Sequence, residues 1–139
     1  MIKQVFDVES YFKVIVYYNV DYDFFNMVEK DLNEAGISKL MLRELWLMMY
    51  YEKAKAVTYS NIEEHICVVL FNYHEDEKDY INSIVHEAEH VKQAMLEAYQ
   101  IEDKGEPPAY TMGYLVGRMW EVFKELVCME CKHKGRDNG

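Results

Sequence analysis

The stretch DEKDYINSIVHEAEHVKQAMLEAY, residues 76–99, is the longest helical pattern in the chain and decides how the rest is interpreted. Apolar side chains recur in it every three or four residues, which predicts an amphipathic helix with one buried stripe. At about 100° per residue, His86 and His90 fall nearly opposite that stripe. We therefore expect the two imidazoles either to face solvent or to face a cleft covered by another segment. The expected stripe consists of Ile81, Ile84, Val85, Ala88, Val91 and Met95.

Residues 86–90 of this helix read His-Glu-Ala-Glu-His, a His-Glu-x-x-His pattern. Side chains four residues apart share a helix face, so both imidazoles can reach one metal ion. Glu87 points slightly off that face, where a carboxylate can accept a proton from a metal-bound water. The pattern predicts His86 and His90 as zinc ligands and Glu87 as the general base of a hydrolytic reaction. Glu89 is expected to be a solvated charge.

A catalytic zinc site needs a third protein ligand and one position open to water. Glu106 is our candidate, because it follows a turn around residues 103–105 from which the chain can fold back toward the histidines. The alternative is a first-turn carboxylate that stabilises the dipole of the following helix. Tyr110 also has two interpretations, as a hydrogen-bond donor to a developing oxyanion or as an ordinary tyrosine on a helix face.

The remaining elements complete an α+β domain. Residues 12–20 (FKVIVYYNV) form an apolar run typical of a buried strand, and residues 54–60 and 65–73 are predicted to form a hairpin. Helices are expected over residues 24–35 and 39–52, and from Glu106 to about residue 128. We therefore expect a small sheet of about three strands packed with four helices. Gly113 and Gly117, one turn apart, suggest a close approach to another backbone.

Composition limits the classes of partner. The 139 residues are enough for a single domain spanning 1–139, with a basic tail from about residue 132. A net charge of −10 disfavours binding to nucleic acid and to anionic membranes. No apolar run approaches the length of a membrane span, and the first residues are too polar for a secretory signal. Three cysteines, an odd number, agree with a reducing compartment, so we expect a cytoplasmic protein.

The motif His86-Glu87-x-x-His90, followed by a downstream glutamate and a helix, resembles the zincin metallopeptidases of the glutamate type. The segment EPPAYTMGY, residues 106–114, is similar to small zincin-like proteins of bacterial genomes and their phages. The resemblance covers about residues 80–123 and implies a minimal zincin-like architecture for the domain. It implies a zinc ion bound by His86, His90 and Glu106, with Glu87 as general base and a peptide or protein as substrate.

A second hypothesis is a catalytically inactive module on the same scaffold, with an interaction or structural role. Residues 45–51 (LWLMMYY) are apolar nearly all round, and any exposed part of them would mark a self-association surface of a homodimer or larger homo-oligomer. Near the C-terminus, Cys128, Cys131 and His133 are either half of a structural zinc site or a helix end with two cysteines.

Overall fold

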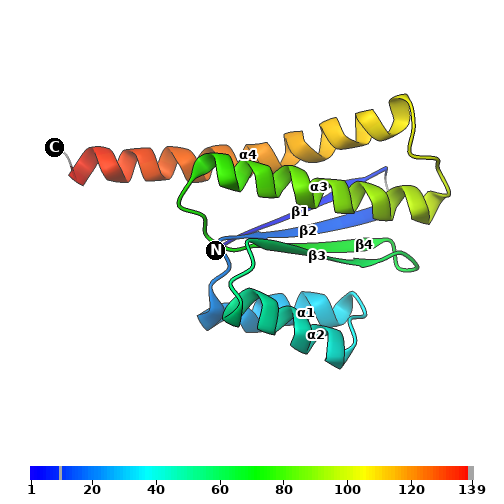
Figure 1. The fold of residues 1–139 in the computed structure, drawn as a ribbon, viewed down its shortest axis with the longest axis horizontal. Coiled ribbons are helices and arrows are strands. Elements are labelled where there is room, and N and C mark those ends of the chain that lie inside the picture. Colours follow the sequence, from blue (N-terminus) through cyan, green and yellow to red (C-terminus); the bar gives the residue numbers. More distant parts are fainter. Residues whose placement is uncertain (10, 138–139) are drawn as a thin grey trace.

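The computed structural model describes residues 1–9 and 11–137, with side chains as far as residue 127, as three layers (Figure 1). The middle layer is a four-stranded sheet in the order β1-β2-β4-β3. Its strands are β1 (Ile2–Val8), β2 (Phe12–Tyr18), β3 (Ala56–Asn61) and β4 (Ile66–Phe71). β1 and β3 are antiparallel to their neighbours, whereas the central pair β2 and β4 is parallel. The predicted α+β class and the predicted hairpin are confirmed, with one strand more than expected.

Helices cover both faces of the sheet. α3 (Glu77–Tyr99) and α4 (Glu106–Asp137) lie on one face, and α1 (Phe25–Glu34) and α2 (Lys39–Trp46) lie on the other (Figure 1). Two short turns of other helix types accompany the second layer, η1 (Tyr22–Phe24) and the π-helical η2 (Leu47–Tyr51). The predicted helix over residues 39–52 is thus an α-helix that continues as one π-helical turn. No helix among the described residues combines the length and the apolar character needed to cross a membrane.

The strand that sequence analysis missed is β1, at one edge of the sheet. It pairs only with β2, and only Phe6 and Val8 of its residues are buried. A strand that buries so few side chains lacks the continuous apolar run of a central strand. The apolar signal of Ile2–Val8 was therefore too weak to predict a strand.

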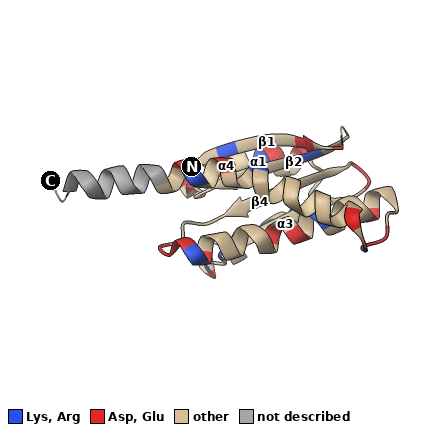
Figure 2. Ribbon diagram, turned by 90° about the horizontal axis from the view of Figure 1, so that it is seen from above, with Lys and Arg blue, Asp and Glu red and all other residues tan. Residues whose placement is uncertain are grey.

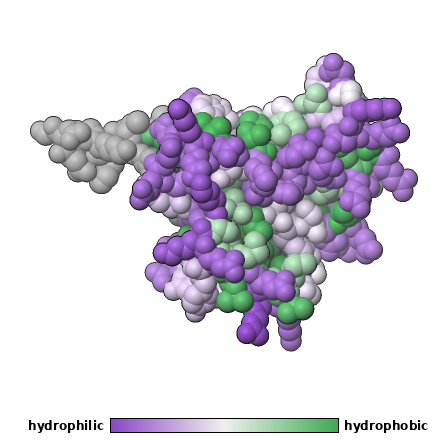
Figure 3. Space-filling view, viewed as in Figure 1, coloured by the Kyte–Doolittle hydropathy of each residue, from purple (hydrophilic) through white to green (hydrophobic). Residues whose placement is uncertain are grey.

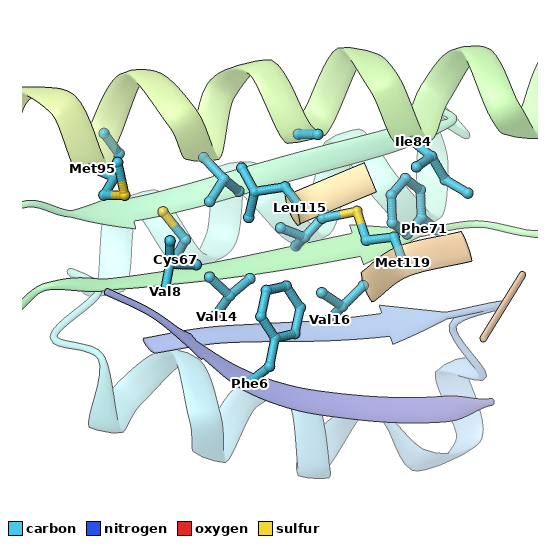
Figure 4. Close-up of a cluster of buried hydrophobic side chains, with 14 of the residues drawn as sticks. Phe6, Val8, Val14, Val16, Cys67, Phe71, Ile84, Met95, Leu115 and Met119 are labelled. Atoms are coloured by element: carbon cyan, nitrogen blue, oxygen red, sulfur yellow. The ribbon is translucent and has the colours of Figure 1, made fainter. Parts of the chain in front are cut away.

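The core beneath α3 and α4 fixes the position of the candidate site. Side chains of the two central strands alternate between the faces of the sheet, so each strand is buried on both sides. Toward α3 and α4, buried side chains from the strands meet buried side chains from both helices (Figure 4). They are Phe6, Val8, Val14, Val16, Cys67 and Phe71 from the strands, Ile84 and Met95 from α3, and Leu115 and Met119 from α4.

The buried stripe of α3 is rotated relative to the predicted one. Ile84, Ala88, Val91 and Met95 are buried as predicted, but Ile81 and Val85 are 41% and 42% exposed. In their place Tyr80, Ser83 and Glu87 are buried, because the sheet meets α3 on the flank that carries Glu87. This rotation draws the carboxylate of the His-Glu-x-x-His motif into the interior.

The expectation for the two glycines of α4 is wrong. A Cβ atom built on Gly113 or Gly117 meets no other atom within 4 Å, so neither glycine permits a close approach. α4 packs instead through Leu115, Met119 and Phe123, which are buried in the core. Nothing in the structure explains the glycines.

Candidate functional site

His86 and His90 lie on the exposed flank of α3, one helical turn apart, as their spacing predicts. Their Nε2 atoms are 3.3 Å apart and their rings are inclined at 78°. Two nitrogens bound to one zinc ion at about 2.0–2.1 Å in a tetrahedral arrangement lie about 3.3 Å apart. The two imidazoles are thus already spaced as two ligands of one tetrahedral ion. Without a metal, one Nε2–H can donate to the other Nε2.

Glu87 faces the interior, although it follows His86 directly. Its side chain is only 5% exposed, and Oε2 accepts a hydrogen bond of 2.6 Å from Oγ1 of Thr58 on β3. This hydrogen bond holds the carboxylate against β3.

Glu106 and Tyr110 are not brought to the histidine pair. Glu106 is the first residue of α4, and Tyr110 lines a groove together with Leu96 and Tyr99 at the C-terminal end of α3. Leu96 is six residues beyond His90, which corresponds to about 9 Å along the helix axis. The two helices run antiparallel, with Tyr80 near the start of α3 beside Phe123 of α4, so the first turn of α4 lies at the far end of α3.

Polar contacts hold the connection between α3 and α4 in this position. Nζ of Lys92 lies 2.8 Å from Oε1 of Glu89 and 3.1 Å from Oδ1 of Asp103, and Gln93 donates to both carboxylates. Hydrogen bonds from Lys92 and Gln93 lower the pKa of Glu89, and the same two partners, Gln93 first, lower that of Asp103. Because Asp103 precedes Glu106 by three residues, this network also sets where α4 begins. Glu89, expected to be a free solvated charge, is part of it.

Of the three expected ligands, the structure places two, His86 and His90, side by side. No group of three or more His, Cys, Asp or Glu side chains within the described part of the chain is arranged to hold one metal ion. The pair itself fits two positions of a zinc ion by the distance between its nitrogens. The first turn of α3 carries Glu77 and Asp79, and Figure 2 shows both acidic and basic residues along this helix.

The other histidines and cysteines with described side chains have structural surroundings. His74 is buried, with Nδ1 2.7 Å from the backbone oxygen of Asn72 and Nε2 2.8 Å from Oγ of Ser83. His65 stacks on Phe12. Burial raises the pKa of the Cys67 thiol to about 12, so this thiol is unreactive near neutral pH. The predicted features at Cys128, Cys131 and His133, and the basic character of the tail, concern side chains outside the described part.

Thr58 is the residue of this region that sequence reasoning missed. Ala56, Thr58 and Ser60 alternate with residues of the other sheet face, so the strand pattern could have placed a hydroxyl beneath the long helix. The pattern could not have identified its partner, because that depends on the rotation of α3 over β3.

Comparison with protein-family models, with curated proteins and with solved structures finds no match to this chain. The functional argument therefore rests on the geometry of α3 and its neighbours.

Proposed function

We propose that this protein is a zinc-dependent hydrolase, with a peptide or protein as substrate, whose metal is held by Nε2 of His86 and His90. The observation that carries the proposal is the 3.3 Å separation of the two nitrogens on an exposed helix flank. A zinc ion bound there supplies Lewis acidity and lowers the pKa of a coordinated water to about 7.

Glu87 is the general base in this proposal. The hydrogen bond from Thr58 orients one carboxylate oxygen, and the other oxygen is left to accept a proton. Because Glu87 neighbours His86 and lies one turn before His90, its backbone is fixed relative to both ligands by the same helix.

The third ligand in this proposal is Glu106. Glu106 is retained from the sequence motif, and it reaches the histidines only if the first turn of α4 moves from its position at the end of α3. Tyr110 lies on the same turn, so its role as oxyanion donor depends on the same movement. Replacing Glu106 by Gln tests this directly, since a ligand affects zinc affinity and a helix-dipole carboxylate does not.

We also propose a cytoplasmic location and a restricted set of partners. The protein acts in the cytoplasm, in keeping with three cysteines that cannot pair completely and with the free Cys67. Nucleic acids and anionic membranes are disfavoured as partners by the net charge of −10.

A second candidate function is a non-catalytic module that self-associates. Apolar side chains reach the surface over the α1 and α2 layer (Figure 3), and the histidine pair by itself occupies half of a tetrahedron. Two copies related by a twofold axis would place four imidazoles around one shared zinc ion. The exposed apolar residues of this layer include Phe24, Met27, Leu40, Met41, Leu47, Met48, Tyr50 and Tyr51.

Measuring hydrolysis by the Glu87→Gln variant distinguishes between the two proposed functions. The zinc-loaded protein is incubated with fluorescent casein and with 4-nitrophenyl acetate, and zinc affinity and stoichiometry are measured by calorimetry on the same samples. Loss of general-base catalysis lowers the rate by about 10²- to 10⁴-fold, while zinc affinity is retained. Glu97→Gln, an exposed carboxylate about three turns further along α3, is the matched control and should hydrolyse as wild type does.

Equal hydrolysis by wild type and Glu87→Gln would reject Glu87 as the base. Absence of zinc-dependent hydrolysis in wild type, together with one zinc per two chains and a dimeric mass, would instead establish the non-catalytic module.

A further inference from the structure

A groove of about 960 Å³ opens at the end of the α3 and α4 layer, away from the histidine pair. The end of β1, the last two turns of α3 and the first turns of α4 surround it. β1 and β3 are opposite edges of the sheet, and Glu87 beside the histidines contacts β3. In this structure the groove is therefore separate from the histidine pair.

The walls of the groove are apolar and aromatic. Val8, Met95 and Leu96 form its buried floor, and Tyr99, Tyr110 and Tyr114 provide three aromatic rings. Tyr110 is 74% exposed and makes no hydrogen bond or ring contact with the described side chains, so its face is free to receive a ligand. Tyr114 is held in place by its hydroxyl, which donates to the backbone oxygen of Asp7 at 2.9 Å.

Glu9 supplies the charge of the groove. Asp7 also borders it, but Phe6 and Val8 face the core beneath α4, so the side chain of Asp7 lies on the opposite side of β1. Glu9 does not continue this alternation, because it follows the last residue of β1 with a left-handed backbone (φ 54°), and it lines the groove. No lysine or arginine is among the described residues that line the groove. Burial raises the pKa of the Tyr99 hydroxyl, and the negative charge of Glu9 raises it further.

We propose that this groove binds a small aromatic amine in its ammonium form. A cation is attracted both by a carboxylate and by the faces of tyrosine rings, and an aromatic body fills an apolar floor. The groove volume is within the range of sites for drug-sized ligands, about 300–1,000 Å³. An anionic ligand would meet the charge of Glu9 without any basic side chain to balance it.

Tyramine and tyrosol test the proposal as a matched pair, because they differ only in an ammonium and a hydroxyl group. Binding of each to the full chain is followed by protein NMR. We expect saturable binding of tyramine, with shifts confined to residues around the groove, and about fivefold weaker binding of tyrosol, as one partly exposed ion pair contributes about 1 kcal/mol. Glu9→Gln should reduce the difference between the two compounds, and Glu102→Gln, an exposed carboxylate outside the groove, should preserve it.

Tyr110→Ala should weaken the binding of both compounds, since it removes a ring without changing the charge. Equal affinities of tyramine and tyrosol for wild type, or no saturable binding of tyramine, would overturn the proposal. So would a tyramine affinity that is unchanged in both the Glu9→Gln and the Tyr110→Ala variants.

Discussion

The exposed flank and the buried flank of α3 have different surroundings, although the residues on them are neighbours in sequence. His86 and His90 face solvent with their nitrogens 3.3 Å apart, whereas Glu87 is buried against the sheet and bonded to Thr58. The exposed flank can exchange ligands without disturbing the core. The buried flank is part of the fold, so a change at Glu87 or Thr58 affects stability as well as any chemistry.

The largest expected effect on stability comes from the binding of zinc to the exposed flank of α3. Zinc at a free concentration of 100 times its Kd should raise the free energy of unfolding by about 2.7 kcal/mol, because it binds the folded chain. Chemical denaturation with and without zinc measures this increase. His90→Ala should abolish it while leaving the stability without zinc nearly unchanged, since His90 is exposed. An equal increase in His90→Ala would mean that zinc binds elsewhere.

A smaller effect is expected on the buried flank. Thr58→Val removes the hydroxyl that donates to Glu87 and leaves a buried carboxylate oxygen without its partner. We expect a loss of about 1.5 kcal/mol in the free energy of unfolding, measured by urea denaturation, because the hydrogen bond is only partly buried. Thr58→Ser keeps the donor and should retain most of the stability. If Thr58→Val is as stable as wild type, the carboxylate is not held by this bond.

The smallest effect concerns the connection that keeps Glu106 away from the histidines. Hydrogen bonds lower the pKa of Glu89 below its usual 4.5 and that of Asp103 below 3.8. A carboxyl group with a lowered folded-state pKa stabilises the fold above its unfolded pKa, and this contribution is lost as the pH falls through the folded pKa. The urea midpoint should therefore drop slightly more between pH 6 and pH 3 in wild type than in Lys92→Met.

Lys104→Met is the control for this pH series, because Lys104 and its partner Glu102 are both largely exposed. A wild-type pH dependence identical to that of Lys92→Met would show that the network does not contribute to the position of the connection.

Much of the fold could be predicted from periodicity. The long helix, the strand near residues 12–18 and the hairpin of β3 and β4 carry strong local patterns, and the structure contains all three. β1 was missed because an edge strand buries few side chains. The parallel pairing of β2 with β4 joins residues more than fifty positions apart and leaves no local signal.

For the candidate site, the spacing in the sequence predicted only the relative positions of residues within one helix. His86 and His90 share a rigid turn, so their convergence follows from the sequence. The burial of Glu87 depends on the rotation of α3 over β3, and the position of Glu106 depends on contacts between Lys92 and Asp103 in the connection. Both are tertiary features that a short motif does not encode.

The central claim is that the two imidazoles bind one ion together, and ¹⁵N NMR of the imidazole nitrogens during a zinc titration tests it most directly. We predict that the Nε2 signals of His86 and His90 shift together and saturate at the same zinc ratio, while those of the buried His74 stay unchanged. A shift of only one of the two signals, or of neither at saturating zinc, would contradict the account.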